Sequence, residues 1–279
     1  MFALPVVFAL GLTLALLTLP RLAFAAGEGG APEDLSGVGI TEHVGDRLPL
    51  DAELVDSNGT AVRLKDLFGR GRPVILTLNY SSCVMFCSLQ LNGLIDALKR
   101  IDLDAPRDFE LITVSIDPSE LPVRAAATKE RYLKQLGRPD VARGWTFLVG
   151  KEEQIRAIAA SVGFGYKWIE AEQQFAHAAG AILVAPDGRI VRYLHGIQHD
   201  PRTLQLGLVE AGEGRVGGVG DRLALFCLEY DAVTGRYALA VGNVVGLSAT
   251  VMVIGVALLL GALSLRARRH AHQGAGRLV

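Results

Sequence analysis

The sequence predicts an α/β domain, a mixed sheet covered by helices, with a membrane-spanning segment after it. Three observations carry this prediction. Short apolar runs rich in β-forming residues alternate with segments whose apolar residues recur at helical spacing. The last two strand-like runs are joined by a Pro-Asp-Gly turn, so the sheet ends in a hairpin and is mixed. Near the C-terminus lies an uncharged run of 28 residues, where about 20 suffice to cross a bilayer.

The N-terminal segment predicts export. Residues 2–20 carry no charge, and Ala23-Phe24-Ala25 fits a small-x-small cleavage site, so residues 1–25 are expected to be a signal peptide or an N-terminal anchor. A mitochondrial transit peptide would be rich in arginine, whereas Arg21 is the only basic residue before Arg47. Bacterial export is therefore expected, and the Gly- and acid-rich residues 26–42 are expected to form a tether.

The strands and helices of the exported domain follow in order. Residues 52–67 predict a hairpin around an Asn-Gly turn, and residues 73–80, almost entirely apolar, predict a strand covered on both faces. After Cys87 the apolar residues recur at i, i+3, i+4 and i+7, which predicts an amphipathic helix. The remaining expected elements are strands at 109–116 and 145–149, helices at 123–136 and 155–162, a hairpin at 181–194 and a closing helix at 201–210.

The C-terminal part predicts membrane attachment. We expect the domain to span residues 43–211, followed by a linker and juxtamembrane segment, 212–237, and a transmembrane helix, 238–265. Arginines follow the apolar run directly, and an excess of arginine marks the cytoplasmic side. Residues 266–279 are therefore expected to be a cytoplasmic tail, which places the domain on the periplasmic side of a bacterial inner membrane.

The charge and the cysteine content argue against nucleic-acid binding and against a disulfide scaffold. A net charge of −1 gives no electrostatic case for nucleic-acid binding. Three cysteines are too few for a disulfide scaffold, and a folded domain of this size does not need one. Cys227, the odd cysteine, is expected to pack as a small apolar residue, with a relay role near the membrane as the alternative. A chemical role is thus expected of the other two cysteines.

Cys83 and Cys87 lie where a buried strand passes into a helix. On one helix face their Cβ atoms would be about 5–6 Å apart, whereas a disulfide needs about 3.5–4.5 Å. A disulfide is feasible if the loop adjusts, and the spacing also leaves room for an ion. A helix N-terminus favours thiolate over thiol. Two thiolates suit Cu(I), or Zn(II) in a fuller set, and either metal needs a further ligand.

Histidines are the candidates for that ligand. Of the six in the chain, two lie beyond the apolar run and His43 directly follows the expected tether. His177 lies in an expected loop directly before a central strand, while His195 and His199 follow the last hairpin. Spacing alone does not choose among these three.

Three segments together resemble the Sco/SenC family: "GDRLPLDAELVDSNGTAVRLKDLFGRGRPVILTLNYSSCVMFC", "LITVSIDP" and "FAHAAGAILVAPDGRIVRYL". The resemblance spans about residues 43–210. It implies a thioredoxin-like fold and an exported protein that assembles cytochrome c oxidase. It also implies that Cys83, Cys87 and His177 bind copper, as Cu(I) and also as Cu(II).

The first hypothesis is a metallochaperone rather than an enzyme, which receives Cu(I) from an upstream donor and passes it to the copper A site of cytochrome c oxidase subunit II. The alternative is a thiol-disulfide reductase, in which Cys83 attacks a partner's disulfide, Cys87 resolves the mixed disulfide and a thiol reductant restores the pair. The usual motif for that work has two intervening residues, and here there are three. A thiol peroxidase and a purely structural disulfide complete the alternatives.

Overall fold

A computed structural model describes residues 35–82 and 86–213, and toward the C-terminus residues 221, 224–225, 228–231, 236–243, 245–246, 248–256 and 258–260. The chain divides into two units, residues 1–36 and 37–279, and every element below belongs to the second. The expected signal peptide or anchor, residues 1–25, lies outside the described residues.

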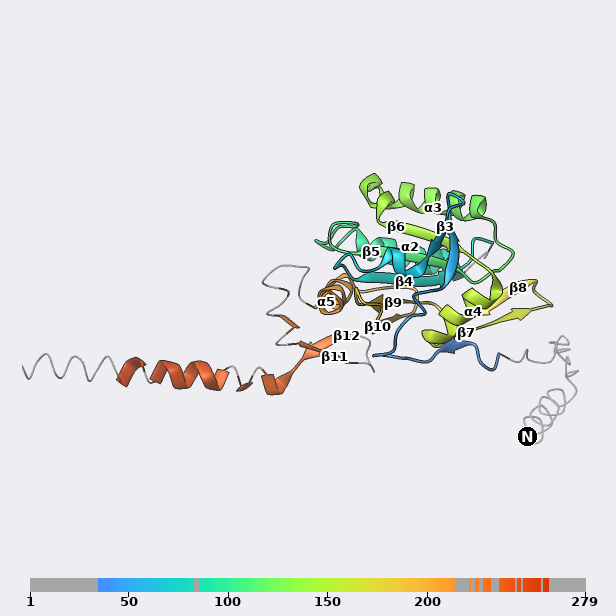
Figure 1. The fold of residues 1–279 in the computed structure, drawn as a ribbon. Coiled ribbons are helices and arrows are strands. Elements are labelled where there is room, and N and C mark those ends of the chain that lie inside the picture. Colours follow the sequence, from blue (N-terminus) through green and yellow to red (C-terminus); the bar gives the residue numbers. More distant parts are fainter. Residues whose placement is uncertain are drawn as a thin grey trace, which may run out of the picture. The chain divides into compact units, whose positions relative to one another are not determined.

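A seven-stranded mixed sheet forms the centre of the domain (Figure 1). Its strand order is β10-β9-β4-β5-β6-β2-β3. The pairs β4–β5 and β5–β6 are parallel and the other pairs are antiparallel, as a mixed sheet requires. The strands are β2 (Glu53–Asp56), β3 (Ala61–Arg63), β4 (Val74–Asn79), β5 (Glu110–Ser115), β6 (Trp145–Val149), β9 (Gly180–Val184) and β10 (Ile190–His195).

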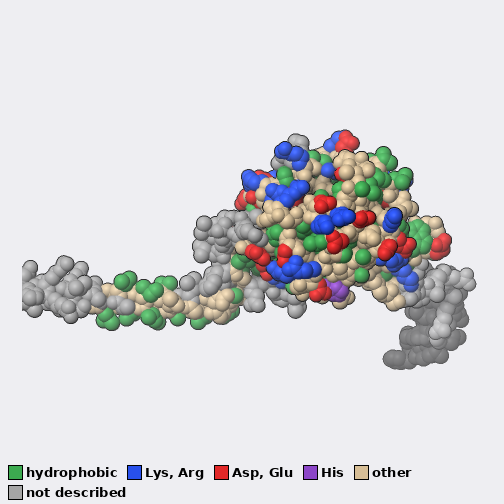
Figure 2. Space-filling view, in the orientation of Figure 1, with side chains coloured by type: hydrophobic (Ala, Val, Ile, Leu, Met, Phe, Trp, Pro, Cys, Tyr) green, Lys and Arg blue, Asp and Glu red, His purple; other side chains and the backbone are tan. Residues whose placement is uncertain are grey.

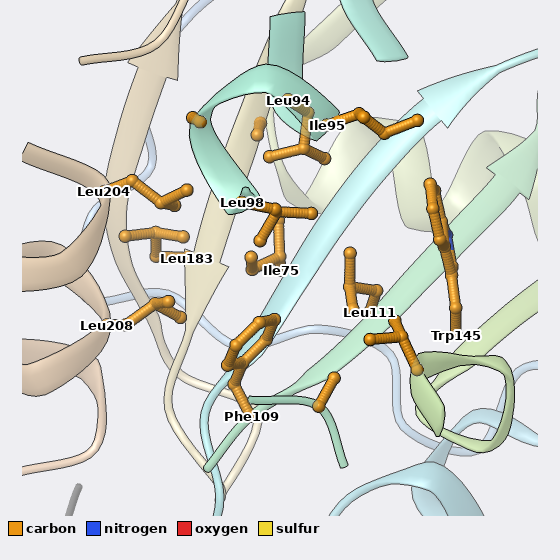
Figure 3. Close-up of a cluster of buried hydrophobic side chains, with 14 of the residues drawn as sticks. Ile75, Leu94, Ile95, Leu98, Phe109, Leu111, Trp145, Leu183, Leu204 and Leu208 are labelled. Carbon is orange, nitrogen blue, oxygen red and sulfur yellow. The ribbon is translucent and has the colours of Figure 1, made fainter. Parts of the chain in front are cut away.

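One face of the sheet packs against three helices, α2 (Phe86–Leu98), α3 (Pro122–Leu136) and α5 (Pro201–Ala211). The apolar stripe that predicted α2 is buried against Ile75 of β4 and Leu183 of β9 (Figure 3). Leu111 of β5 and Trp145 of β6 continue this core, and every residue of β4 and β5 is buried. Burial on both faces explains why these strands are apolar throughout rather than alternating.

The opposite face packs against α4 (Glu152–Ser161) and a short 3-10 helix, Leu64–Leu67. Residues of β4 with the other parity, Leu76 and Leu78, point to this side because side chains alternate along a strand. The strands and helices expected from the sequence are thus confirmed, including the first hairpin and the closing hairpin.

A second, three-stranded sheet was not expected from the sequence. It consists of β1 (Gly39–Ile40), β7 (Phe164–Ile169) and β8 (Gln174–His177), in the order β1-β7-β8. Part of the segment expected to be a tether therefore pairs with the domain. A side chain at residue 165 would bring a Cβ within 1.8 Å of the Gly37 carbonyl oxygen, so glycine is what allows β1 to approach β7.

The segment after α5 contains a small hairpin, β11 (Leu228–Asp231) and β12 (Arg236–Leu239). It touches the domain at α5, where the Tyr237 hydroxyl donates to Glu210 Oε2 at 2.6 Å. The first two residues of the run expected to span the membrane belong to β12. Residues 214–220 and Cys227 lie outside the described residues.

An apolar helix follows this hairpin. Val241–Leu260 has 20 residues and a mean hydropathy of 2.2, long and apolar enough to cross a membrane by length and composition. None of the described residues of this stretch is buried. Figure 2 shows apolar side chains along it, in contrast to the charges of both signs on the domain.

Candidate metal centre

The cysteine segment joins the end of β4 to the start of α2. Cys83 lies outside the described residues, and Cys87 is the second residue of α2, described for its backbone alone. The geometry between the two sulfur atoms therefore stays a prediction. The helix begins at Phe86, so the expectation that the pair lies at a strand-to-helix junction is confirmed.

A buried carboxylate holds the backbone directly before this segment. Glu120 Oε2 accepts a hydrogen bond from the Ser81 backbone N–H at 2.9 Å, and Oε1 accepts a short one from the Ser81 hydroxyl. The Ser115 hydroxyl, at the end of β5, also donates to Oε2, at 2.7 Å. The next residue is held as well, because Arg124 of α3 donates to the Ser82 hydroxyl at 2.6 Å.

His177 is the last residue of β8, although the sequence predicted a loop at this position. The loop prediction was wrong because this segment forms a strand that pairs with β7, where His177 lies opposite Tyr166. Its side chain is partly buried beside two aromatic rings, with centroids 6.0 Å from Tyr80 and 5.9 Å from Phe164. The hairpin thus brings His177 to the end of β4.

The orientation of the His177 ring follows from one contact. Nδ1 lies 2.8 Å from the Ala178 carbonyl oxygen. A carbonyl can only accept a hydrogen bond, so Nδ1 carries the proton and the neutral ring has its lone pair on Nε2. Metal-binding histidines are commonly oriented in this way, by a carbonyl bound to the other nitrogen.

Tyr80 connects the two parts of the candidate site, and no role was expected for it from the sequence. Its hydroxyl accepts a hydrogen bond from the Phe175 backbone N–H at 3.2 Å, and its ring meets that of Phe175 edge-on at 5.5 Å. Cys83 follows three residues later, within about 11 Å along the backbone. An aromatic residue directly after the buried strand was the available signal, but its partner is 95 residues away in sequence.

Buried amides lie on the same side of the sheet as α2. Gln90 of α2 is fully buried and its Nε2 donates to the Gly180 carbonyl at 2.6 Å, three residues after His177. Asn79, at the end of β4, is also buried, and within the described part of the chain its Nδ2 has no hydrogen-bond partner. Asn79 shares its strand parity with Ile75, which faces α2. A buried N–H donor at this end of the sheet is compatible with a thiolate, which can accept it.

The other histidines of the domain have different surroundings. His195 is half-exposed at the end of β10, and its Nε2 lies 2.7 Å from Glu42 Oε1. His199 is buried before α5, and burial lowers the pKa of its imidazole to about 4. His43, which directly follows the expected tether, has its Nδ1 3.1 Å from the Ser161 carbonyl oxygen. Among the described residues there is no cluster of three His, Cys, Asp or Glu side chains suited to a metal. That finding does not include the two cysteine side chains.

Comparisons with known proteins agree with this architecture. A putative electron transfer protein from Aquifex aeolicus VF5 matches with a TM-score of 0.52 and 24% identity, over 60% of this chain and 94% of that one. ScoI from Arabidopsis thaliana, solved with copper bound, matches with a TM-score of 0.46 and 24% identity, over 57% of this chain and 94% of that one. The comparison with curated proteins gave no match.

The fold is therefore α/β and thioredoxin-like. A family model provides the more specific finding. The model described as SCO1/SenC matches residues 45–208, which is more than half of the chain and includes both cysteines of the CxxxC pair and His177. The chain belongs to the SCO1/SenC family.

Proposed function

We propose that this protein is a membrane-tethered copper chaperone that acts in the assembly of cytochrome c oxidase. Cys83, Cys87 and His177 bind Cu(I), and the copper is delivered to the copper A site of subunit II. Family membership supports the copper and oxidase context. The observation that carries the site assignment is the contact between His177 and Tyr80, three residues before Cys83.

The donor set fits Cu(I) as cargo. Two thiolates are soft ligands that suit Cu(I), and a neutral imidazole adds a third. The hydrogen bond from Nδ1 of His177 to Ala178 supplies the tautomer with its lone pair on Nε2. A three-coordinate site leaves room for an incoming ligand, so copper passes to the partner by ligand exchange.

Location is part of the same proposal. The domain acts on the periplasmic side of a bacterial inner membrane, anchored by the apolar helix Val241–Leu260. Copper comes from an upstream donor. In this proposal subunit II receives the copper on the same side of the membrane.

Copper binding by the full chain, purified in detergent and reduced, tests the site. We expect one Cu(I) per chain, and we expect Cys83→Ala, Cys87→Ala and His177→Ala each to weaken binding by more than about tenfold, since loss of an outer-shell partner alone costs about 10–100-fold. The measurement is competition against a Cu(I) chelator. His195→Ala is the matched control, because this histidine lies on the neighbouring hairpin against Glu42, and it should bind copper as wild type does. Full retention in His177→Ala would remove His177 from the site.

Oxidase assembly in cells separates the chaperone from the thiol-disulfide reductase. Both activities need the two cysteines, so cysteine variants do not discriminate. Disulfide exchange needs two thiols and no imidazole. We therefore expect His177→Ala to lose oxidase activity nearly as fully as Cys83→Ala. Near-normal oxidase activity in His177→Ala would make the reductase the better assignment.

A further inference from the structure

We infer that Glu120 is a positioning residue for the cysteine pair, which fixes where the backbone leaves β4 toward Cys83. Ser81 and Ser82 are the last described residues before Cys83. Ser81 donates two hydrogen bonds to the Glu120 carboxylate, one from its backbone N–H and one from its hydroxyl. The inference uses the proposed copper site for one of its readouts. The other readouts need no copper.

The Glu120 carboxylate lies where the ends of β4 and β5 meet the start of α3. Its two oxygens accept from the Ser81 N–H, the Ser81 hydroxyl and the Ser115 hydroxyl. Asn79 and Ser115 lie opposite each other at the ends of the parallel strands β4 and β5. The carboxylate therefore ties together the two strand ends at the edge of the sheet from which the cysteine segment departs.

Glu120 is itself held in place by its neighbours in sequence. Its backbone N–H donates to the Asp117 carbonyl at 3.1 Å and closes a turn. Within that turn the Ser119 N–H and hydroxyl both donate to Asp117 Oδ1, at 2.8 and 2.6 Å. Helix α3 begins two residues later at Pro122, whose ring fixes the backbone at the helix start. The carboxylate thus acts from a rigid support.

The burial of Glu120 explains why its contacts matter. The residue is 7% exposed, and a buried carboxylate is costly unless hydrogen bonds satisfy its oxygens. Its three donors are uncharged and all lie at the strand ends, so moving the Ser81 backbone would leave a carboxylate oxygen without a donor. The backbone before Cys83 is therefore restrained, because moving it would leave a buried oxygen of Glu120 without a hydrogen bond.

Glu110, the first residue of β5, provides a matched control. It is also 7% exposed, but it lies at the opposite end of β5, where it pairs with Arg72 at 2.5 Å and with Arg70 at 3.5 Å. Glu110→Gln removes a buried carboxylate of equal exposure at the end of β5 away from the cysteine segment. It measures what general destabilisation alone does to the copper site.

The experiment compares wild type with E120A, E120Q and E110Q, each as the full chain in detergent. The first readout is hydrogen exchange, followed by mass spectrometry, of a peptide that contains the Ser81 amide in the reduced, copper-free protein. The second is the rate of Cys83 alkylation in the same state. The third is Cu(I) affinity by chelator competition. E120Q keeps the shape of the side chain and one carbonyl oxygen, so it remains informative if E120A does not fold.

We expect faster Ser81 exchange and an altered Cys83 alkylation rate in both Glu120 variants. Copper affinity should fall roughly tenfold or more in E120A and less in E120Q, in line with the 10–100-fold effect of outer-shell partners. E110Q should match wild type in all three readouts. Wild-type Ser81 exchange and copper affinity in E120Q and E120A would overturn the inference, and so would an equal loss in E110Q. If wild type binds no copper, the proposed function fails, and the exchange and alkylation readouts still decide the role of Glu120.

Discussion

His177, Tyr80 and Glu120 show how single residues define the candidate site. Tyr80 and Glu120 each contact a residue distant in sequence, Tyr80 with Phe175 and Glu120 with Ser81. The His177 ring lies beside the distant Tyr80, and its Nδ1 contact with the neighbouring Ala178 carbonyl sets which ring nitrogen carries the lone pair. The local sequence pattern predicts that the cysteines lie at the junction of β4 and α2. His177, Tyr80 and Glu120 reach this junction through contacts between distant segments.

His199 gives a prediction at the residue scale. Burial lowers its pKa from 6.5 to about 4 in the folded protein, so between these values the unfolded chain binds more protons. The free energy of unfolding should therefore fall as the pH falls through this window, by about 2 kcal/mol between pH 7 and pH 5 from this residue. His199→Leu removes this contribution. Urea unfolding of the full chain in detergent at both pH values measures it.

Above pH 7 the two proteins should show the same pH dependence, because His199 is then neutral in both the folded and the unfolded state. Titration of other groups is common to both proteins and cancels in the difference. An equal pH dependence of wild type and His199→Leu between pH 7 and pH 5 would show that the buried imidazole does not resist protonation.

At the scale of elements, α2 is held closely at two points. Gln90 connects it to the first residue of β9, and Gly93 lies against the loop before α5. A Cβ on residue 93 would lie 1.7 Å from the Ile197 carbonyl oxygen, so the helix and the loop are in backbone contact. The helix that carries Cys87 is therefore fixed relative to the strand that follows His177.

Gly93→Ala should destabilise the protein, although alanine normally gains about 1 kcal/mol over glycine inside a helix. The added methyl group meets backbone atoms that cannot move cheaply, so we expect a net loss of about 2 kcal/mol or more in the free energy of unfolding. Gly207→Ala in α5 is the control, because its Cβ would clash with the tip of the Leu183 side chain, at 2.5 Å, and would meet the Tyr237 hydroxyl at an ordinary contact distance of 3.9 Å. Urea unfolding followed by tryptophan fluorescence measures both. Equal losses in the two variants would contradict the backbone-contact explanation.

At the scale of the whole molecule, the hairpin of β11 and β12 contacts the domain rather than only leading away from it. The Tyr237 hydroxyl donates to Glu210, which also pairs with Arg192 at 2.5 Å. Burial and the neighbouring Glu210 carboxylate raise the pKa of the Tyr237 hydroxyl, so it remains a donor. Asp221 adds a second contact, with Arg202 of α5 at 2.6 Å. The segment expected to be a linker thus makes specific contacts along α5.

Membrane topology gives the prediction at this scale. Arg266, Arg268 and Arg269 follow the apolar run, and arginine excess marks the cytoplasmic side. We expect a periplasm-active reporter to be silent when fused after residue 279 and active when fused after residue 211. A reporter active only in the cytoplasm should give the reverse pattern. A periplasmic signal at residue 279 would overturn the topology.

The sequence by itself determined the elements whose signal is local. Buried strands such as β4 and amphipathic helices such as α2 show their burial in the spacing of their own residues. The junction that holds Cys83 and Cys87, and the apolar run after β12, follow from the same local patterns. For these segments, neighbouring residues and elementary geometry are enough.

Only the tertiary structure decided how the rest comes together. The strands β7 and β8 are partly exposed and pair outside the central sheet, so their pattern is weak and His177 was expected in a loop. The approach of His177 to Tyr80, the support of Ser81 by Glu120 and the burial of His199 all depend on contacts between distant segments. Periodicity reports which side of an element is buried, and it carries no information on which distant residue lies against it.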